Sequence, residues 1–325
     1  MRPILLHGHE RAITQIRYNR EGDLLFSAGK DHSPSVWYSD NGERLGTYDG
    51  HSGVVWCINR DSTKVVTGSG DNSYIIWDCE TGKQLHRIDT RAAVRSCGFS
   101  YSGRALLITT DQQRGYESEI LLFGLDDPTQ INDGEPYLRI PISKDNAKIT
   151  TAVWGKLDRY LIVGHENGEV SQFDATTGEK LHSVTEHRKA ISDINMYKDQ
   201  SMFVTASKDS TAKLFDADDL TLLKTYKTER PVNSAALSSL KDHVVLGGGQ
   251  EAIDVTTTAA QAGKFDARFY HVVFEEEIGR VKGHFGPINS VRFHPDGKSY
   301  SSGGEDGYVR VHQFDQSYFD FEFEY

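Results

Sequence analysis

The sequence has few cysteines and no long apolar run. Its 325 residues include three cysteines, Cys57, Cys79 and Cys97. This odd and small number excludes a disulfide framework and favours a reducing compartment. The apolar stretch near the N-terminus covers only residues 3–6, which is too short for the hydrophobic region of a signal peptide. No run approaches the ~20 apolar residues that cross a bilayer. We therefore expect a soluble, cytoplasmic protein.

Clustered positive charge is also missing. The chain has 36 Lys and Arg against 47 Asp and Glu, a formal net charge of −11, and no run of five basic residues. An acidic surface repels phosphate, which argues against direct nucleic-acid binding and against an anionic membrane surface.

Motifs for cofactors and metals are absent as well. The glycines of "GGGQ" at 247–250 lack the lysine and the following helix of a phosphate-binding loop. His7 and His9 have no nearby cysteine or second histidine cluster to complete a metal site. We expect no cofactor, no metal and no enzymatic activity.

Internal repeats cover almost the whole chain. Gly-His pairs, or the near copy Glu-His, recur with a β-branched residue four positions later and an aspartate 20–22 positions later. With three weaker copies, the repeats start near residues 9, 51, 90, 145, 187, 228 and 284. Within each, stretches such as "AITQIRYN" alternate with a period of two, which predicts about four short strands. A four-stranded sheet cannot bury both faces alone, so the sheets must pack on one another. We predict an all-β, seven-bladed propeller spanning residues 1–325 as a single domain.

The repeated Gly-His, turn aspartate and Trp-Asp resemble the WD-repeat family. This resemblance implies a hydrogen-bonded tetrad in each well-matched repeat. The predicted members are His9, Ser27, Asp31 and Trp37; His51, Thr67, Asp71 and Trp77; His187, Thr205 and Asp209; and His284, Ser302 and Asp306. Phe215 and His312 stand in the tryptophan positions of the last two sets. Such Ser/Thr, His and Asp sets could also be read as catalytic, but their repetition favours a structural role, because a catalytic set occurs once.

The two chain ends are predicted to meet in one sheet. The first Gly-His lies eight residues from the start, so residues 3–6 supply the outer strand that the last repeat lacks, and paired edges replace exposed ones. The tail, residues 316–325, alternates aromatic and acidic residues, which predicts a half-buried strand. It either packs on the last sheet or binds a partner.

Two repeats carry insertions. Repeat three is extended after Asp111 and again before residue 145. Repeat six has 18 extra residues between Gln250 and Phe274, with the long polar segment at 251–266. Insertions in repeat arrays map to loops, often on a binding face, although a tolerated surface insertion is the alternative.

The run from Leu246 to Tyr325 and the N-terminal "MRPILLHGHERAITQIRYNREGDLLFSAGKD" resemble the i-subunit family of eukaryotic translation initiation factor three. The resemblance implies a non-catalytic scaffold that joins the C-terminal segment of the b subunit and the N-terminal region of the g subunit. The resulting complex promotes recruitment of messenger RNA to the small ribosomal subunit and scanning. The alternative is another WD-repeat adaptor, in signalling or protein degradation.

No partner-binding motif can be carried over residue by residue, so the candidates come from chemistry. Carboxylates in repeat five can select a basic helix, and aromatic or arginine residues make the better anchors. The candidate residues are Asp216, Asp218, Asp219, Lys241, Asp242, Gln250, Lys264, Phe265 and Arg268. A solvated acidic turn is the plainer interpretation of the three aspartates.

Overall fold

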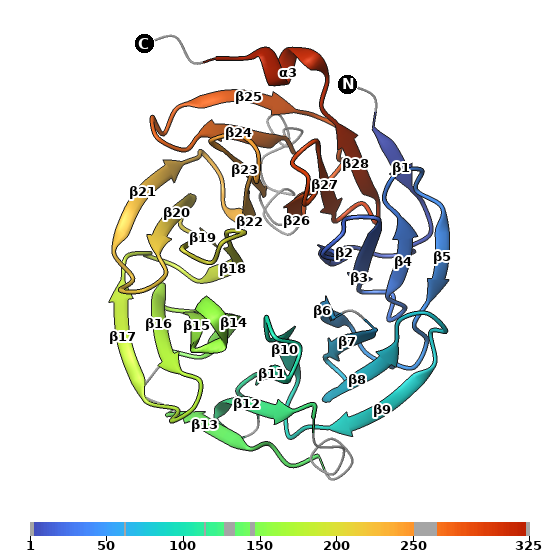
Figure 1. Cartoon of the computed structure of the whole chain (residues 1–325), viewed down its shortest axis with the longest axis vertical. Coiled ribbons are helices and arrows are strands. Elements are labelled where there is room, and N and C mark those ends of the chain that lie inside the picture. The colour runs from blue at the N-terminus through green and yellow to red at the C-terminus, as the bar shows by residue number, and fades with distance from the viewer. Residues whose placement is uncertain are drawn as a thin grey trace, which may run out of the picture.

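Seven sheets surround a central opening in the computed structural model of the chain (Figure 1). The structure describes residues 3–61, 63–113, 115–126, 134–143, 147–249 and 265–322. Every sheet has four antiparallel strands, which confirms the predicted seven-bladed propeller. The helical segments among these residues are short: a 3-10 turn, η1 (Lys156–Asp158), and α3 (Gln316–Asp320).

The blades follow one another along the chain. Blade one contains β2 (Ile13–Tyr18), β3 (Leu24–Gly29), β4 (Ser35–Tyr38) and β5 (Arg44–Thr47). Blade two contains β6 (Val55–Arg60), β7 (Lys64–Ser69), β8 (Ser73–Asp78) and β9 (Gln84–Asp89). Blade three contains β10 (Val94–Phe99), β11 (Ala105–Thr110), β12 (Ser118–Gly124) and β13 (Leu138–Ile142). Blade four contains β14 (Ile149–Trp154), β15 (Tyr160–His165), β16 (Glu169–Asp174) and β17 (Lys180–Thr185).

The remaining blades have the same order from the central opening outward. Blade five contains β18 (Ile191–Met196), β19 (Met202–Ser207), β20 (Thr211–Asp216) and β21 (Leu222–Lys227). Blade six contains β22 (Val232–Leu237), β23 (His243–Gly248), β24 (Ala267–His271) and β25 (Glu277–Val281). Blade seven contains β26 (Ile288–Phe293), β27 (Ser299–Gly304) and β28 (Val309–Gln313), and its outer strand is β1 (Ile4–Leu6).

The apolar core lies between neighbouring blades. Second strands such as β7, "KVVTGS", are buried along nearly their whole length, whereas outer strands such as β9 alternate between exposed and half-buried residues. Val66 and Tyr74 of blade two, for example, share one buried cluster with Leu106 of blade three. Each sheet therefore buries its two faces against the two adjacent sheets.

Ring closure occurs as the sequence predicts. Strand β1 pairs antiparallel with β28, with Ile4 opposite Val311 and Leu6 opposite Val309. Leu6 is only 1% exposed and belongs to a buried cluster with Trp37 of blade one. The N-terminal strand thus completes blade seven and packs that blade onto blade one.

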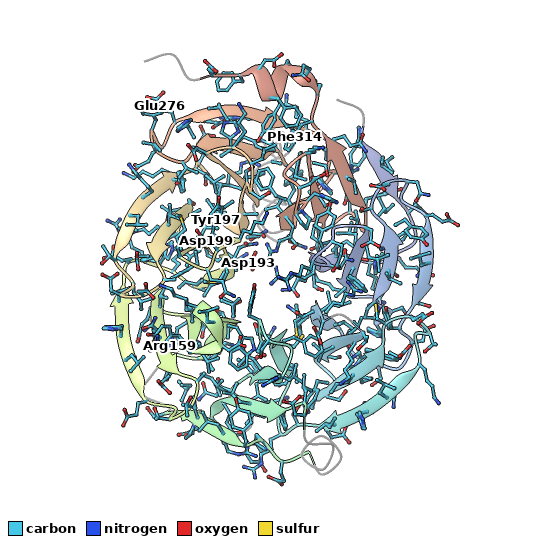
Figure 2. The ribbon with its side chains drawn as sticks, in the orientation of Figure 1. Arg159, Asp193, Tyr197, Asp199, Glu276 and Phe314 are labelled. Atoms are coloured by element: carbon cyan, nitrogen blue, oxygen red, sulfur yellow. The ribbon has the colours of Figure 1, made fainter. Side chains whose placement is uncertain are left out.

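A buried ion pair joins inner strands across the ring. Asp193 of β18 accepts two hydrogen bonds from the Arg292 guanidinium of β26, at 2.7 and 3.0 Å. The Ser234 hydroxyl of β22 donates to Asp193 at 2.6 Å. Figure 2 shows Asp193 at the inner side of blade five. The pair links blades five and seven through blade six, and its bidentate geometry fixes their relative orientation.

The described part of the tail, residues 316–322, contains no strand, so the prediction from its alternating pattern is wrong there. Residues 316–320 form α3, whose first turn is capped by the Asp315 carboxylate, the acceptor for the Tyr318 N–H. The preceding strand, β28, is already paired on both edges by β27 and β1, so no edge remains beside it. The tail nevertheless packs on the sheets: the Tyr318 ring stacks on Phe314, and Tyr318 Oη lies 2.8 Å from His243 Nδ1 in blade six.

The ring closure generates a test with adjacent residues. Leu6→Ala should lower the free energy of unfolding by about 2–4 kcal/mol, because it leaves a cavity between blades seven and one. Leu5→Ala, at a side chain that is 54% exposed, should change it by less than about 0.5 kcal/mol. Urea unfolding of both variants measures the difference. Equal effects would mean that β1 does not hold the ring closed.

Candidate functional site

Blades one and two contain complete hydrogen-bonded chains of the predicted tetrad residues. Trp77 Nε1–H donates to Thr67 Oγ1 at 2.8 Å, Thr67 Oγ1 lies 2.8 Å from His51 Nε2, and His51 Nδ1 lies 3.0 Å from Asp71. In blade one, the corresponding distances for Trp37, Ser27, His9 and Asp31 are 2.8, 2.6 and 2.7 Å. With a neutral imidazole, each group donates to the next and the chain ends on a carboxylate.

In blades one, two, five and seven, the tetrad aspartate fixes the loops on one face of the blade. Asp71 lies in the turn between the second and third strands, and it also accepts a hydrogen bond from the Ser52 N–H in the loop that enters the blade, at 2.9 Å. Glu10, Arg188 and Phe285 donate in the same way to Asp31, Asp209 and Asp306. We call the face that carries these loops the tetrad face.

Blades five and seven keep three members and replace the tryptophan. His187 bonds Thr205 and Asp209 at 2.7 and 3.0 Å, and the buried Phe215 stacks on Phe203 where a tryptophan would donate. Without a tryptophan N–H beside it, the Thr205 hydroxyl also lies 3.2 Å from the carbonyl oxygen of Lys213.

In blade seven, His284 bonds Ser302 and Asp306, and the Arg310 guanidinium donates to Asp306 at 2.9 Å. His312 Nδ1, in the tryptophan position, is buried and has no hydrogen-bond partner among the described residues. Sequence reasoning missed Arg310. The histidine in place of tryptophan was a signal that this blade's tetrad differs.

The environment of the tetrads lowers the pKa of their aspartates and favours the neutral form of His51 and His284. Burial lowers the pKa of His51 and of His284, although Asp71 and Asp306 act in the opposite direction. For Asp71, burial favours the protonated form, but hydrogen bonds from Ser73 and Ser52 and the contact with His51 outweigh it and lower the pKa to about 2. The pKa values of Asp209 and Asp306 are lowered in the same way.

The candidate partner-binding residues divide between two faces. Asp216, Asp218 and Asp219 lie at or in the turn between β20 and β21, and Lys241 and Asp242 lie between β22 and β23. In an antiparallel sheet, these two kinds of connection leave the blade at the same end, opposite the tetrad loops. We call this side the hairpin face.

Of the other candidates, Phe265 lies between β23 and β24, and Arg268 lies within β24. Phe265 and Arg268 are both 8% exposed, so the structure places them inside blade six rather than at an accessible anchor position. Arg268 Nη2 lies 3.7 Å from Glu229 Oε2, and Arg268 Nη1 lies 3.9 Å from Glu277 Oε2. Gln250, Lys264 and most of the insertion at 251–266 lie outside the described residues.

The hairpin face of blades four to six combines carboxylates with exposed apolar side chains. Asp218 pairs with Lys156 at 2.6 Å, and Asp219 accepts a hydrogen bond from the Thr221 N–H. Tyr197 and Asp199 lie in the neighbouring loop between β18 and β19 (Figure 2). The exposed apolar residues on this side are Leu157, Leu240, Val273 and Phe274.

Hydrogen bonds hold the loops of this surface together across the blades. The Leu157 N–H donates to Gln200 Oε1 at 2.8 Å, which joins blades four and five. Lys224 Nζ donates to the Val273 carbonyl at 2.7 Å, which joins blades five and six. Sequence reasoning missed the exposed leucines and Val273, because an apolar residue in a turn gives no periodic signal. The hairpin surface, defined as residues 156–157, 197–200, 216–219, 240–242 and 273–274, is one connected platform.

Neither a metal cluster nor a membrane helix is found in the part of the chain that the structure describes. Those residues contain no group of three or more His, Cys, Asp or Glu side chains that could hold a metal ion. Among the same residues, no helix is long and apolar enough to span a bilayer.

The tetrads generate a test that uses the missing tryptophan of blade five. Thr67→Val keeps the side-chain volume but leaves the Trp77 indole and His51 without their partner, and should lower stability by about 2–3 kcal/mol. Thr205→Val removes the hydroxyl beside His187 and its long contact with the Lys213 carbonyl but involves no indole, and should cost about 1 kcal/mol. Chemical denaturation of the two variants gives the comparison. A cost at Thr205 equal to that at Thr67 would contradict a contribution from the indole N–H.

Acid should weaken the tetrads. Because the pKa of Asp71 is lower in the folded state, its stabilisation is present above about pH 4 and is lost as the pH falls toward 2. Asp71→Asn should therefore destabilise the protein at neutral pH, and its difference in Tm from the wild type should shrink toward low pH. Asp40→Asn is the control, because it removes an exposed carboxylate that belongs to no tetrad. A constant difference for Asp71→Asn would exclude the ionised carboxylate as the cause.

Comparison with known proteins gives matches along the full length of the chain. A family model described as EIF3I matches residues 1–324. The chain is 65% identical over 327 residues to "Eukaryotic translation initiation factor 3 subunit I" of Nematostella vectensis, and 63% identical over 326 residues to the proteins of the same name from Xenopus tropicalis and Homo sapiens. Each match covers 100% of both chains. The chain therefore belongs to the family of eukaryotic translation initiation factor 3 subunit I, whose members are translation initiation factor subunits.

Proposed function

We propose that the chain is a non-catalytic scaffold of the cytoplasmic initiation factor three complex. In this role it docks the C-terminal segment of the b subunit and the N-terminal region of the g subunit, and supports recruitment of messenger RNA to the small ribosomal subunit and scanning. Full-length identity of 62–65% to relatives named as subunit I carries the proposal. It supports membership of the same assembly, because the match includes every blade.

The chemistry of the histidine sets supports a non-catalytic role. In blade one, Ser27, His9 and Asp31 are ordered as in a hydrolase triad, with the hydroxyl 2.6 Å from Nε2 and the carboxylate 2.7 Å from Nδ1. However, the Ser27 hydroxyl is fully buried and also accepts the Trp37 N–H. A nucleophile needs access to a substrate carbonyl, and here the same atoms are used to hold a loop.

The hairpin surface is where we place the b subunit. Its carboxylates at Asp199, Asp218 and Asp219 complement Lys or Arg, and its exposed Leu240 and Val273 can receive apolar side chains. An amphipathic helix with basic residues beside an apolar stripe offers both groups, and the charges would speed encounter and select orientation. Lys156 neutralises part of Asp218, so Asp219 is the stronger unpaired acceptor for a partner cation.

This placement is tested by reversing charge. The double variant Asp218→Lys, Asp219→Lys should weaken binding of the b subunit's C-terminal segment at least about tenfold, since two favourable contacts become repulsive. Isothermal titration with the purified segment measures it, and binding of the g subunit's N-terminal region should be unchanged.

Glu166→Lys is the matched control, an exposed carboxylate on the tetrad face of blade four. If the double variant binds as tightly as the wild type, the b subunit does not use this turn. If the wild-type chain binds neither subunit, the scaffold proposal itself is wrong.

A further inference from the structure

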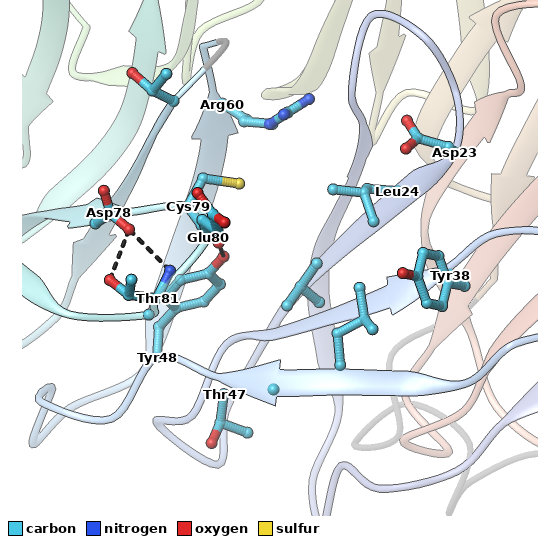
Figure 3. A pocket seen from close by; sticks show the side chains of 15 residues that line it. Asp23, Leu24, Tyr38, Thr47, Tyr48, Arg60, Asp78, Cys79, Glu80 and Thr81 are labelled. Atoms are coloured by element: carbon cyan, nitrogen blue, oxygen red, sulfur yellow. Dashed lines mark hydrogen bonds between the residues drawn. The ribbon is translucent and has the colours of Figure 1, made fainter.

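A cleft of about 630 Å³ lies at the rim between blades one and two (Figure 3). Leu24, Val36 and Tyr38 of blade one lie on one side, and the β8–β9 turn from Asp78 to Gly82 of blade two lies on the other. Leu45 of the outer strand β5 lines the cleft and is 45% exposed. Its volume is in the range of sites that accept a small ligand or a few side chains.

A glycine in the outer strand keeps this cleft open. Gly46 pairs with Val36, and a Cβ added at Gly46 would meet no atom within 4 Å. The register places His86 of blade two and His182 of blade four at the equivalent position. Gly46 therefore removes a side chain that other blades carry over the same face.

At two other interfaces between blades, an apolar side chain fills this space. In blade seven the position of Gly46 is Ile4, and in blade three it is Leu138. The turn glycine of the following blade packs closely on each: a Cβ at Gly42 would lie 2.8 Å from Ile4, and one at Gly178 would lie 3.3 Å from Leu138. Between blades one and two, the matching Gly82 has only the Thr47 carbonyl nearby, at 3.7 Å.

Blade six has the same glycine, and there the chain's own tail packs beside the site without filling the space over the glycine: a Cβ added at Gly279 would meet no atom within 4 Å. Gly279 pairs with Phe269, as Gly46 pairs with Val36. The Tyr318 ring of α3 meets the Phe269 ring edge to face, with centroids 6.3 Å apart.

The register extends the match between blades six and one. His243, which bonds Tyr318, stands at the position of Leu24. Ile278, which belongs to the same apolar cluster as Phe269, stands at the position of Leu45. In blade six, a short aromatic helix thus packs on Phe269 and His243, next to the outer-strand glycine.

The charge of the first cleft differs from that of the tail. Among the residues that line it, Asp23, Asp78 and Glu80 are acidic and Arg60 is the one base. Asp78 accepts hydrogen bonds from the Thr81 hydroxyl and N–H, at 2.6 and 2.8 Å, which hold its carboxylate at the rim. The chain's own tail carries Asp320, Glu322 and Glu324 beside its aromatic residues, so the acidic rim disfavours the tail of a second copy.

We propose that the cleft between blades one and two is a second docking site, which binds a short helical segment of a partner protein with aromatic anchors flanked by Lys or Arg. The aromatic side chains would enter between Tyr38 and Leu45, over Gly46. The basic residues would face Asp23 and Glu80. The site is separate from the hairpin surface of blades four to six, and it does not depend on the b subunit binding there.

The test uses the full-length chain and two fluorescein-labelled peptides. The first has the sequence of residues 316–325 with Asp320, Glu322 and Glu324 replaced by lysine, and the second has the natural acidic sequence. Fluorescence anisotropy should give a Kd for the lysine peptide at least about tenfold lower than for the acidic peptide, weakening as salt is raised.

Gly46→His should weaken binding of the lysine peptide at least about tenfold without changing Tm, because histidine already stands at this position in two other blades. Leu181→His, at an exposed residue of the outer strand of blade four, is the matched control and should have no effect. The pair Asp23→Lys, Glu80→Lys tests the charge separately and should abolish the preference for lysine.

Three results would overturn the proposal. The first is no binding of the lysine peptide up to about 1 mM. The second is equal affinity in the wild type and Gly46→His, which would place the peptide elsewhere. The third is tight binding of the acidic peptide that Gly46→His removes, which would identify the occupant as the tail of a second copy.

Discussion

No blade of this protein can bury its own faces, and the rest of the structure depends on that constraint. A four-stranded sheet has two apolar faces and needs a neighbour on each side, so the array is stable only as a closed ring. The pairing of β1 with β28 closes the ring by joining the first and last strands of the chain. The Asp193–Arg292 ion pair links the inner strands of blades five and seven. Because the sheets support one another, the loops at their ends can vary without loss of the fold.

The tetrads place side chains of catalytic type in buried, structural positions. Each one uses a histidine, a hydroxyl and a carboxylate, the groups of a hydrolase, to attach an entering loop to a turn. Burial makes these bonds strong and removes the atoms from solvent, so the same arrangement that rigidifies the ring cannot act on a substrate. In the proposed function, recognition uses the connections, such as the β20–β21 turn, where the Asp218 N–H donates to Asp216 and the Thr221 N–H donates to Asp219.

The sequence predicts the features that repeat and misses those that occur once. The repeat spacing together with the resemblance to the WD-repeat family located His51, Thr67 and Asp71, because the same local geometry recurs in several blades. It predicted a strand for the tail, since alternation reports which residues are apolar but not whether a sheet edge is open to pair with them. It likewise could not show that Arg268 is buried beside Glu277. Leu157 bonds Gln200 of the next blade, 43 residues along the chain, so its surroundings cannot be predicted from the local sequence.

Repetition also explains how binding sites can arise on such a ring. At the four interfaces compared above, the same outer-strand position lies near the next blade, and the residue at that position differs from one interface to the next. Ile4 and Leu138 pack against a turn glycine, whereas Gly279 leaves room near which α3 packs its aromatic rings. The change from a filled groove to an open one requires no rearrangement of the backbone, because outer strands are half exposed and carry little of the core. Gly46 is such a change at the rim of blade one. The ring can therefore acquire a new binding groove by losing one side chain, while its tetrads and core stay intact.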